Sequence, residues 1–242
     1  MILCALELAM NIHIHSDSDL VGKGLYTVPE ASRLTGVPAN TFRRWVFGYI
    51  RRRGGERVDY PPLTAPDIGK IEGQYIVGFR DLLEVRVVHA FRKAGVSWHI
   101  IRLAAKNTQT NDRPSHPFLS KRFRTDGHTI FLETAEEAGD PKLIDLARNQ
   151  RAFHSVIAPS LFKQIVFGAD EEPLLWYPAW PKKTIVIDPS RAFGRPLAGD
   201  VPADILASMV RIEKFIDSAA RWFDVPKEAV EAAVDWHERL AA

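Results

Sequence analysis

The chain has 242 residues, 46% apolar and 26% charged, which is typical of a globular protein with a buried core rather than a disordered or fibrous one. Its single cysteine, Cys4, excludes a disulfide framework and a cysteine-rich zinc or iron–sulfur site. The sequence contains no run of 18 or more apolar residues, the length that a membrane-spanning helix needs. The net charge of +2 conceals an asymmetry. Residues 1–125 hold 19 Lys/Arg against 11 Asp/Glu, whereas residues 126–242 hold 13 against 19. A basic half of this kind indicates a polyanionic partner.

Residues 1–22 are predicted to form a flexible tail. Residues 1–10 are apolar but lack a basic n-region and contain Glu7, so we expect no secretory signal and a cytoplasmic protein. His13 and His15, with the acids at 17 and 19, could be proposed as a metal site. No further ligand cluster lies nearby, so we interpret the segment as a polar linker and expect no metal and no cofactor.

The segment after the tail predicts two short helices joined by a sharp turn. Thr27 is a candidate N-cap, Pro29 and Glu30 suit a first helical turn, and Gly36 interrupts the helix before a second one begins at Pro38. Five apolar side chains are expected to line the joint between the helices: Ala31, Leu34, Val37, Phe42 and Trp45. This pattern predicts a helix-turn-helix.

Further elements follow in chain order. The basic segment with Gly54-Gly55 predicts a wing or hairpin tip, and residues 73–77 predict a returning strand. Helices are expected over 79–94, ended by Gly95, and over 98–106, capped by Ser97. Residues 107–117 are expected to form a loop, and residues 123–132, interrupted by Asp126-Gly127, predict a β-hairpin.

The remaining middle segments carry weaker patterns. We expect an acidic loop over 136–141 and a short helix over 141–148, and residues 161–167 are ambiguous between strand and helix. Residues 174–181 are expected to be extended because their prolines bar a helix, and residues 184–189 to form a strand followed by a turn. Three helices complete the chain, over 202–210, 213–223 and 226–240.

The end of the chain repeats the spacing of the first helix pair. Ala31, Val37 and Phe42 recur as Ala219, Val225 and Val230 at the same two intervals, and a proline follows the turn valine in both copies. The charges differ: residues 38–45 carry two arginines and no acid, whereas residues 226–240 carry a net charge of −2. Because DNA phosphates attract the first helix and repel the second, we hypothesise that the N-terminal copy binds DNA and the C-terminal copy binds protein or dimerises.

The candidate DNA-binding residues lie in two groups. The first begins the second helix, where helix-turn-helix proteins read base edges in the major groove: Asn40, Thr41, Arg43 and Arg44. The second is expected to grip phosphates or the minor groove: Arg51, Arg52, Arg53 and Arg57. The alternative for both groups is an ordinary solvated charged face.

Residues 27–45 resemble the opening of MerR-type winged-helix regulators, through the run Thr27-Val28-Pro29-Glu30-Ala31 and the later Arg43-Arg44-Trp45. The resemblance implies that Arg43 and its neighbours contact operator DNA and that the wing grips the backbone. Two features depart from that family: no long heptad helix follows for a coiled-coil dimer, and no cysteine cluster is present for metal sensing.

Residues 184–240 are similar to a different family, the small DUF433-like domain of unknown function in VapB-type antitoxins, through the strand, Asp188-Pro189, the Gly194-Arg195-Pro196 run and the helices. The resemblance implies a PIN-like ribonuclease toxin as partner. Arg191 and Arg195 could reach the acidic pocket of such a nuclease, although pairing with nearby acids is the stronger alternative. Trp222 and Trp236 are further candidates for partner contact, with core packing as the alternative.

These observations predict a mainly α fold with short β-elements (α+β). We expect a tail over 1–22, a winged helix-turn-helix over 23–75, an α+β middle over 76–183 and a C-terminal helical domain over 184–242. The function expected is a DNA-binding antitoxin that neutralises a PIN-like toxin and autorepresses its operon, as a homodimer or a toxin–antitoxin hetero-oligomer on a double-stranded operator. The alternatives are a MerR-like regulator that senses a ligand or partner, and a protein-binding adaptor. No catalytic motif is present, so we expect no enzyme.

Overall fold

The computed structural model describes residues 20–108, 116–139, 141, 144 and 159–241. Helices alternate with short antiparallel β-pairs, as the sequence predicted for an α+β fold. The N-terminal elements are β1 (Tyr26–Thr27), α2 (Val28–Thr35), α3 (Ala39–Phe47), β2 (Tyr49–Arg53), β3 (Glu56–Tyr60), β4 (Gly69–Ile71) and β5 (Gln74–Val77). The middle elements are α4 (Phe79–Lys93), α5 (Trp98–Thr108), η1 (Pro117–Leu119), α6 (Lys121–Ala138), α9 (Pro159–Phe162), β6 (Ile165–Phe167) and β7 (Pro173–Trp176).

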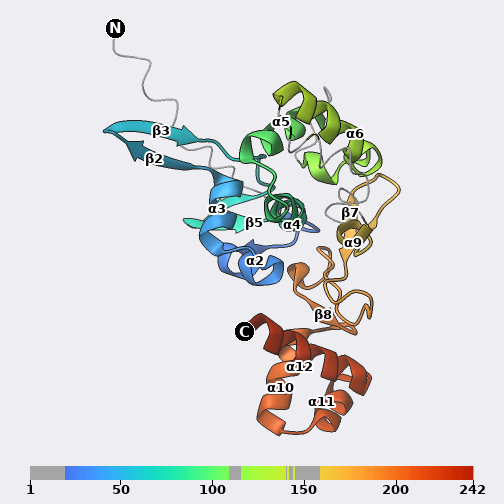
Figure 1. Ribbon diagram of the computed structural model, residues 1–242. Coiled ribbons are helices and arrows are strands. Elements are labelled where there is room, and N and C mark those ends of the chain that lie inside the picture. Colours follow the sequence, from blue (N-terminus) through green and yellow to red (C-terminus); the bar gives the residue numbers. More distant parts are fainter. Residues whose placement is uncertain (1–19, 109–115, 140, 142–143, 145–158, 242) are drawn as a thin grey trace.

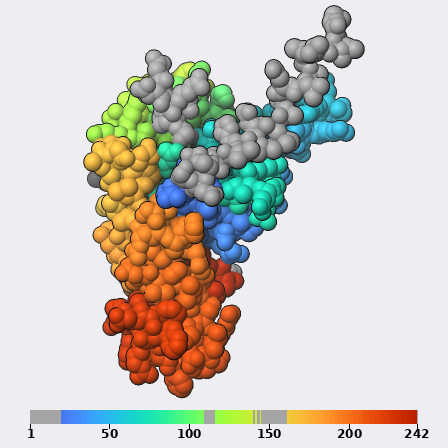
Figure 2. Space-filling view, turned by 180° about the vertical axis from the view of Figure 1, so that it is seen from behind, coloured from blue at the N-terminus to red at the C-terminus, as the bar shows by residue number. Residues whose placement is uncertain are grey.

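The C-terminal elements are η2 (Ala192–Gly194), β8 (Leu197–Ala198), β9 (Val201–Pro202), α10 (Ala203–Glu213), α11 (Ile216–Phe223) and α12 (Lys227–Ala241). In Figures 1 and 2 these helices form one end of the molecule, and the β2–β3 hairpin projects from the other. Among the described residues, no helix is both long and apolar enough to cross a membrane.

The first helix pair forms as its sequence predicts. The backbone N–H and the hydroxyl of Thr27 donate to the Glu30 carboxylate, and Thr27 Oγ1 accepts from the Glu30 N–H, which completes a capping box at the start of α2. Gly36 ends α2 in the left-handed conformation, with φ +70°. Val37 and Phe42 are fully buried between α2 and α3, where Ala31 lets the two helices approach.

A β-hairpin follows α3 directly. Gly54 and Gly55 form its two-residue turn, both with positive φ, which matches the right-handed twist of the flanking strands. Gly48 makes the bend from α3 into β2: a Cβ there would lie 2.6 Å from the Tyr60 carbonyl oxygen, so only glycine fits. A separate three-stranded sheet, ordered β1-β5-β4, supports the base of the helix pair.

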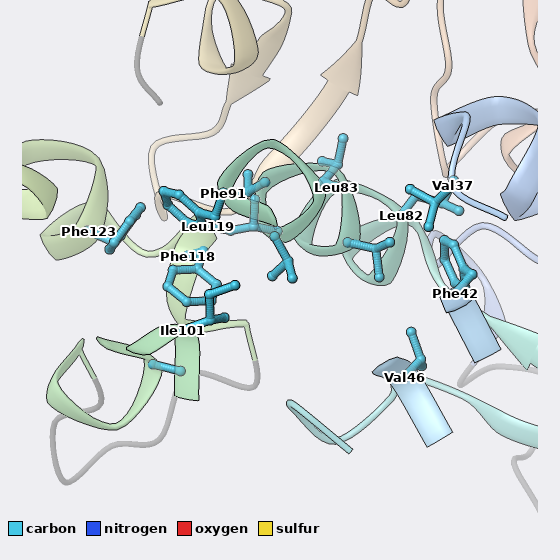
Figure 3. Close-up of a cluster of buried hydrophobic side chains, with 14 of the residues drawn as sticks. Val37, Phe42, Val46, Leu82, Leu83, Phe91, Ile101, Phe118, Leu119 and Phe123 are labelled. Atoms are coloured by element: carbon cyan, nitrogen blue, oxygen red, sulfur yellow. The ribbon is translucent and has the colours of Figure 1, made fainter. Parts of the chain in front are cut away.

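Helix α4 runs through the larger of two hydrophobic cores, as Figure 3 shows. Leu82, near its start, lies beside Val37 and Phe42 of the helix-turn-helix, and Phe91, near its end, packs edge-on against Phe118 and Phe123. This one helix therefore joins the helix-turn-helix to α5, η1 and α6.

Residues 121–138 form helix α6, so the β-hairpin predicted over residues 123–132 is wrong, and residues 136–138 of the predicted acidic loop belong to the helix. Ser120 caps the helix through a 3.2 Å bond from the Phe123 N–H. Phe123, Ile130 and Phe131 follow the helical period and are buried, and Gly127 lies inside the helix against the Phe123 ring. The turn preference of Asp126-Gly127 is overridden by this apolar face.

Other segments agree with their sequence predictions only in part. Residues 161–167 contain both structures, since α9 ends at Phe162 and β6 begins at Ile165. Residues 184–189 form isolated bridges at Val186 and Ile187 rather than a continuous strand. The predicted helix over 141–148, apart from Pro141 and Ile144, lies outside the described residues, as do the tail up to residue 19 and residues 109–115 of the loop predicted over 107–117. The ends of that predicted loop are wrong, since residues 107–108 belong to α5 and Pro117 begins η1.

The C-terminal helices repeat the first helix pair. Ala219 and Val230 are fully buried, Asp224 adopts the left-handed conformation between α11 and α12 as Gly36 does between α2 and α3, and α2 and α11 both have eight residues. The predicted internal repeat is therefore present in the fold. This second pair packs with α10 around the smaller hydrophobic core.

Candidate nucleic-acid interface

The basic residues of α3 lie on its outer surface. Asn40 and Arg44 are exposed, whereas Thr41 and Arg43 are half-buried. Phe42 and Val46, on the opposite face, are buried against α2 and α4. The packing of α3 therefore directs the four residues predicted to contact DNA away from the core.

Arg43 is held by an aromatic residue of β5. Its guanidinium lies 4.8 Å from the centre of the Tyr75 ring, and its Nη2 donates to the Tyr75 hydroxyl at 3.5 Å. The ammonium of Lys70 lies 4.6 Å from the same ring, and the ring packs on Phe47 at 4.5 Å. Burial raises the pKa of the Tyr75 hydroxyl, but the bond from Arg43 and the positive charges of Lys70 and Arg43 outweigh it, so the pKa lies below its usual value.

Arg44 has a similar aromatic neighbour in the next hairpin. Its guanidinium lies 5.1 Å from the Tyr49 ring, which stacks on Tyr60 across the strands at 4.5 Å. The Leu63 N–H donates to the Trp45 carbonyl, so the chain leaving β3 is fastened to α3. The hairpin base and α3 therefore form one unit.

The hairpin itself concentrates positive charge. Arg51, Arg52, Arg53 and Arg57 are all exposed, and Arg57 pairs with Asp59 at 3.1 Å. Arg52 and Arg57 are direct cross-strand partners. Like charges opposite each other destabilise a sheet, so this placement favours a role in binding an anion over a role in stability.

Sequence reasoning missed Lys70, Tyr75 and Tyr49. Lys70 and Tyr75 face each other across β4 and β5, and Tyr49 begins β2. No local pattern in β4 or β5 marks Lys70 or Tyr75, because their proximity to Arg43 depends on how the small sheet packs beside α3.

The four C-terminal residues predicted to contact a protein partner occupy different environments. Arg191 pairs with Asp200 at 2.8 Å and Arg195 pairs with Asp204, so both arginines already have acidic neighbours. The side chain of Trp222 is 75% exposed on α11, whereas Trp236 is only 7% exposed and belongs to the smaller core. Of the two tryptophans, only Trp222 is presented on the surface.

One buried cluster among the described residues has metal-ligand chemistry. Asp67, Asp81 and His116 offer ligand atoms within 4.8 Å of one another. However, Arg80 binds both carboxylate oxygens of Asp67, and Asp81 accepts from His116 at 2.8 Å and from the Gly78 N–H at 2.8 Å. A cationic side chain already neutralises Asp67, so we interpret the cluster as a structural ion network.

The buried Glu84 carboxylate extends this network. Its Oε1 accepts from the Phe118 N–H, and its Oε2 has no hydrogen-bond partner among the described residues. Burial raises the pKa of Glu84 to about 7. Burial lowers the pKa of His116, but its bond to Asp81 and the surrounding carboxylates outweigh that effect and raise the pKa above its usual value.

The fold defines a protein with a helix-turn-helix domain whose outer surface is basic. Residues 24–105 match the family described as "Putative DNA-binding HTH domain", a range that includes α2, α3, the hairpin and α4.

Two curated relatives and one solved structure, all from Mycobacterium tuberculosis, resemble most of the chain. "Putative antitoxin VapB45" is 28% identical over 87% of this chain and 92% of its own length. "Uncharacterized protein Rv2308" is 25% identical over 93% of this chain and 94% of its own length. The crystal structure of Rv2018 superposes with a TM-score of 0.66 at 24% identity and covers 86% of this chain and 96% of that one, which shows a shared fold.

Proposed function

We propose that this protein is a DNA-binding antitoxin that neutralises a PIN-like ribonuclease toxin and represses its own operon. The observation that carries the proposal is the convergence of arginines from α3 and the β2–β3 hairpin on a helix-turn-helix whose family description is DNA binding. A protein named as a putative antitoxin, which is 28% identical over 87% of this chain, supports the antitoxin part of the proposal.

In this proposal α3 enters the major groove of the operator, as MerR-like recognition helices do. Asn40, Thr41 and Arg44 approach base edges or neighbouring phosphates, and Arg43 does so from its place on Tyr75. The hairpin acts as a wing whose arginines grip the backbone and contribute affinity that depends on salt but little on sequence.

The opposite end of the molecule suits a protein partner. The exposed face of α12 carries Glu228, Glu231, Asp235 and Glu238, so it would be repelled by phosphates. Trp222 on α11 and Phe215 at its start are exposed by 75% and 67%, and exposed aromatic side chains are common anchors of protein interfaces. We propose that the DUF433-like C-terminal module contacts the toxin through this region.

A twofold assembly fits operator binding. Helix-turn-helix proteins commonly bind near-palindromic sites as dimers, with one recognition helix in each half-site. We therefore propose a homodimer, or a toxin–antitoxin hetero-oligomer, as the species that represses the operon.

Co-expression with the neighbouring gene tests the antitoxin proposal. If that gene encodes a PIN-like nuclease, its expression alone should arrest growth, and co-expression of this protein should restore growth and co-purify with the nuclease. A variant with Trp222→Ala and Phe215→Ala should lose both effects, while Arg43→Ala should keep them because it lies at the DNA end. Growth arrest that persists in the presence of the wild-type protein would contradict the proposal.

The alternative is a MerR-like regulator that senses a ligand or partner. It is favoured by a cavity of about 460 Å³ lined by residues of α2 and α12, because a ligand there would touch the helix-turn-helix directly. For a regulator of this kind, co-expression with the neighbouring gene would leave growth unchanged.

A further inference from the structure

A cavity of about 460 Å³ lies where the helix-turn-helix meets the C-terminal helices. Arg33 and Leu34 of α2 line one wall, and Trp236 and Leu240 of α12 line the other; we call this the seam cavity. In Figure 1 the C-terminal end of α12 lies below α2. Its volume falls within the range of roughly 300–1,000 Å³ typical of small-molecule sites.

The seam cavity is formed by contacts already present in the fold. The Tyr26 hydroxyl donates to the Gly194 carbonyl at 2.8 Å, and the Leu25 N–H donates to the Phe193 carbonyl at 2.9 Å. Leu34 packs against both hydrophobic cores. These contacts fix the walls relative to each other, so a ligand would enter a preformed space.

Most of the wall is apolar. Apart from the ionisable Glu30, Arg33, Arg195, Asp204 and His237, the lining residues are Leu25, Tyr26, Leu34, Pro196, Ala203, Trp236, Leu240 and Ala241. A ligand that fills this space gains from the burial of its own apolar body.

The charged or basic lining residues are Glu30, Arg33, Arg195, Asp204 and His237, and of the two arginines only Arg33 lacks an ion pair with a described residue. Glu30 already accepts from the backbone N–H of Thr27 at 2.8 Å and from its hydroxyl at 2.7 Å. Asp204 pairs with Arg195. Arg33 is exposed at the cavity and forms no ion pair with any described residue, so an incoming carboxylate would find its guanidinium available.

We propose that the seam cavity binds a small organic anion with an apolar body, of the aromatic carboxylate class. The carboxylate pairs with Arg33, and the ring lies among Leu34, Pro196 and Leu240. This site does not depend on the antitoxin proposal, because it uses neither the DNA-binding arginines nor Trp222.

Calorimetric titration of the full chain with naphthalene-2-carboxylate and its uncharged analogue naphthalene-2-carboxamide tests the proposal. We expect saturable 1:1 binding of the carboxylate, about fivefold tighter than the carboxamide, since one exposed ion pair distinguishes them. Arg33→Ala should reduce the carboxylate affinity to that of the carboxamide. Arg221→Ala is the matched control, because Arg221 follows Ala219 in α11 at the same interval as Arg33 follows Ala31 in α2. This control variant should leave the affinities for both ligands unchanged.

A second variant tests the cavity independently of charge. Ala241 is an exposed lining residue at the end of α12, so Ala241→Trp should fill part of the space without disturbing either core and weaken both ligands. Absence of saturable binding at millimolar concentrations would overturn the proposal, as would equal affinity for the two ligands, or affinities that neither Arg33→Ala nor Ala241→Trp changes.

Discussion

At the scale of single residues, the basic side chains of α3 owe their positions to aromatic rings on neighbouring strands. Arg43 and Lys70 lie over Tyr75 at 4.8 and 4.6 Å, and Arg44 lies over Tyr49 at 5.1 Å. A cation held over a ring loses less conformational freedom when it meets a phosphate or a base than a free one does. Tyr75 is therefore a positioning residue for the proposed DNA contacts.

Replacing Tyr75 by alanine should weaken operator binding. The lost cation–π contact with Arg43 is worth about 0.5–1 kcal/mol at an exposed site, which corresponds to a two- to fivefold loss of affinity. Tyr75→Phe keeps the ring and should keep most of the affinity, since it loses only the long 3.5 Å bond from Arg43. Fluorescence anisotropy with labelled operator DNA measures both variants. Unchanged affinity for Tyr75→Ala, at wild-type thermal stability, would contradict this role.

The buried Glu84 predicts how stability depends on pH. Burial raises its pKa from 4.5 to about 7, so between these values the folded protein binds a proton that the unfolded chain has released. The stability from this proton is complete below pH 4.5 and is lost as the pH rises through 7. The raised pKa of His116 acts in the same direction.

Glu84→Gln should flatten this dependence. The glutamine keeps the acceptor for the Phe118 N–H and stays neutral, so it should remove roughly 2–3 kcal/mol of the decline in unfolding free energy between pH 5 and pH 8. Urea unfolding at a series of pH values measures the change. A variant with the same pH slope as the wild-type protein would show that Glu84 is ionised in the fold throughout this range.

At the scale of elements, helix α6 shows where reasoning from sequence fails. Asp126-Gly127 favours a hairpin turn on local grounds, but Phe123, Ile130 and Phe131 have the spacing of a helix face and bury against α4 and η1. Local turn preference amounts to about 1 kcal/mol, and the burial of three large apolar side chains exceeds it. The sequence contained both signals, and tertiary packing decides between them.

Substitution of two glycines of α6 tests its helical structure. Gly127 lies inside the helix, and the nearest atoms to an added Cβ belong to the Phe123 ring at 3.4 Å or more, so Gly127→Ala should stabilise the protein by about 0.5–1 kcal/mol. Gly139 ends the helix at φ +61°, so Gly139→Ala should destabilise it by about 1 kcal/mol. Denaturant unfolding measures both. Destabilisation by Gly127→Ala would instead favour a turn at that position.

The two helix pairs, by contrast, were predictable from the sequence. In both pairs the buried alanine and the valine of the turn are separated by the same interval, which the sequence shows directly. The caps of α2, Thr27 and Gly36, act through local hydrogen bonds that can also be predicted from sequence. The contributions of Lys70, Tyr75 and the Asp67–Arg80 network were not predictable, because they join segments brought together only by the packing of β4–β5 and α4. Helices and turns can therefore be predicted from local sequence, whereas the contacts around the basic surface depend on packing between distant segments.

At the scale of the whole molecule, charge is divided between two copies of one helix pair. The copy with Arg43 lies beside the arginine-rich hairpin, and the copy that carries Glu231 at the corresponding position lies at the far end (Figure 1). A phosphate backbone attracts the first and repels the second. The arginine-rich hairpin and the acidic helix pair therefore lie at opposite ends of the molecule. We propose a DNA-binding role for the basic end and a protein-binding role for the acidic end.

The salt dependence of DNA binding by the full chain tests the central claim most directly. Anisotropy titrations on DNA from upstream of its own gene should show affinity falling steeply with salt. The double variant Arg52→Ala/Arg57→Ala should reduce the slope of log affinity against log salt by about 2, since each lost phosphate contact contributes roughly 0.9. The matched variant Arg211→Ala/Arg221→Ala, which removes the same charge from the C-terminal helices, should leave the slope unchanged. Equal slopes for all three proteins would contradict the assignment of DNA binding to the hairpin end.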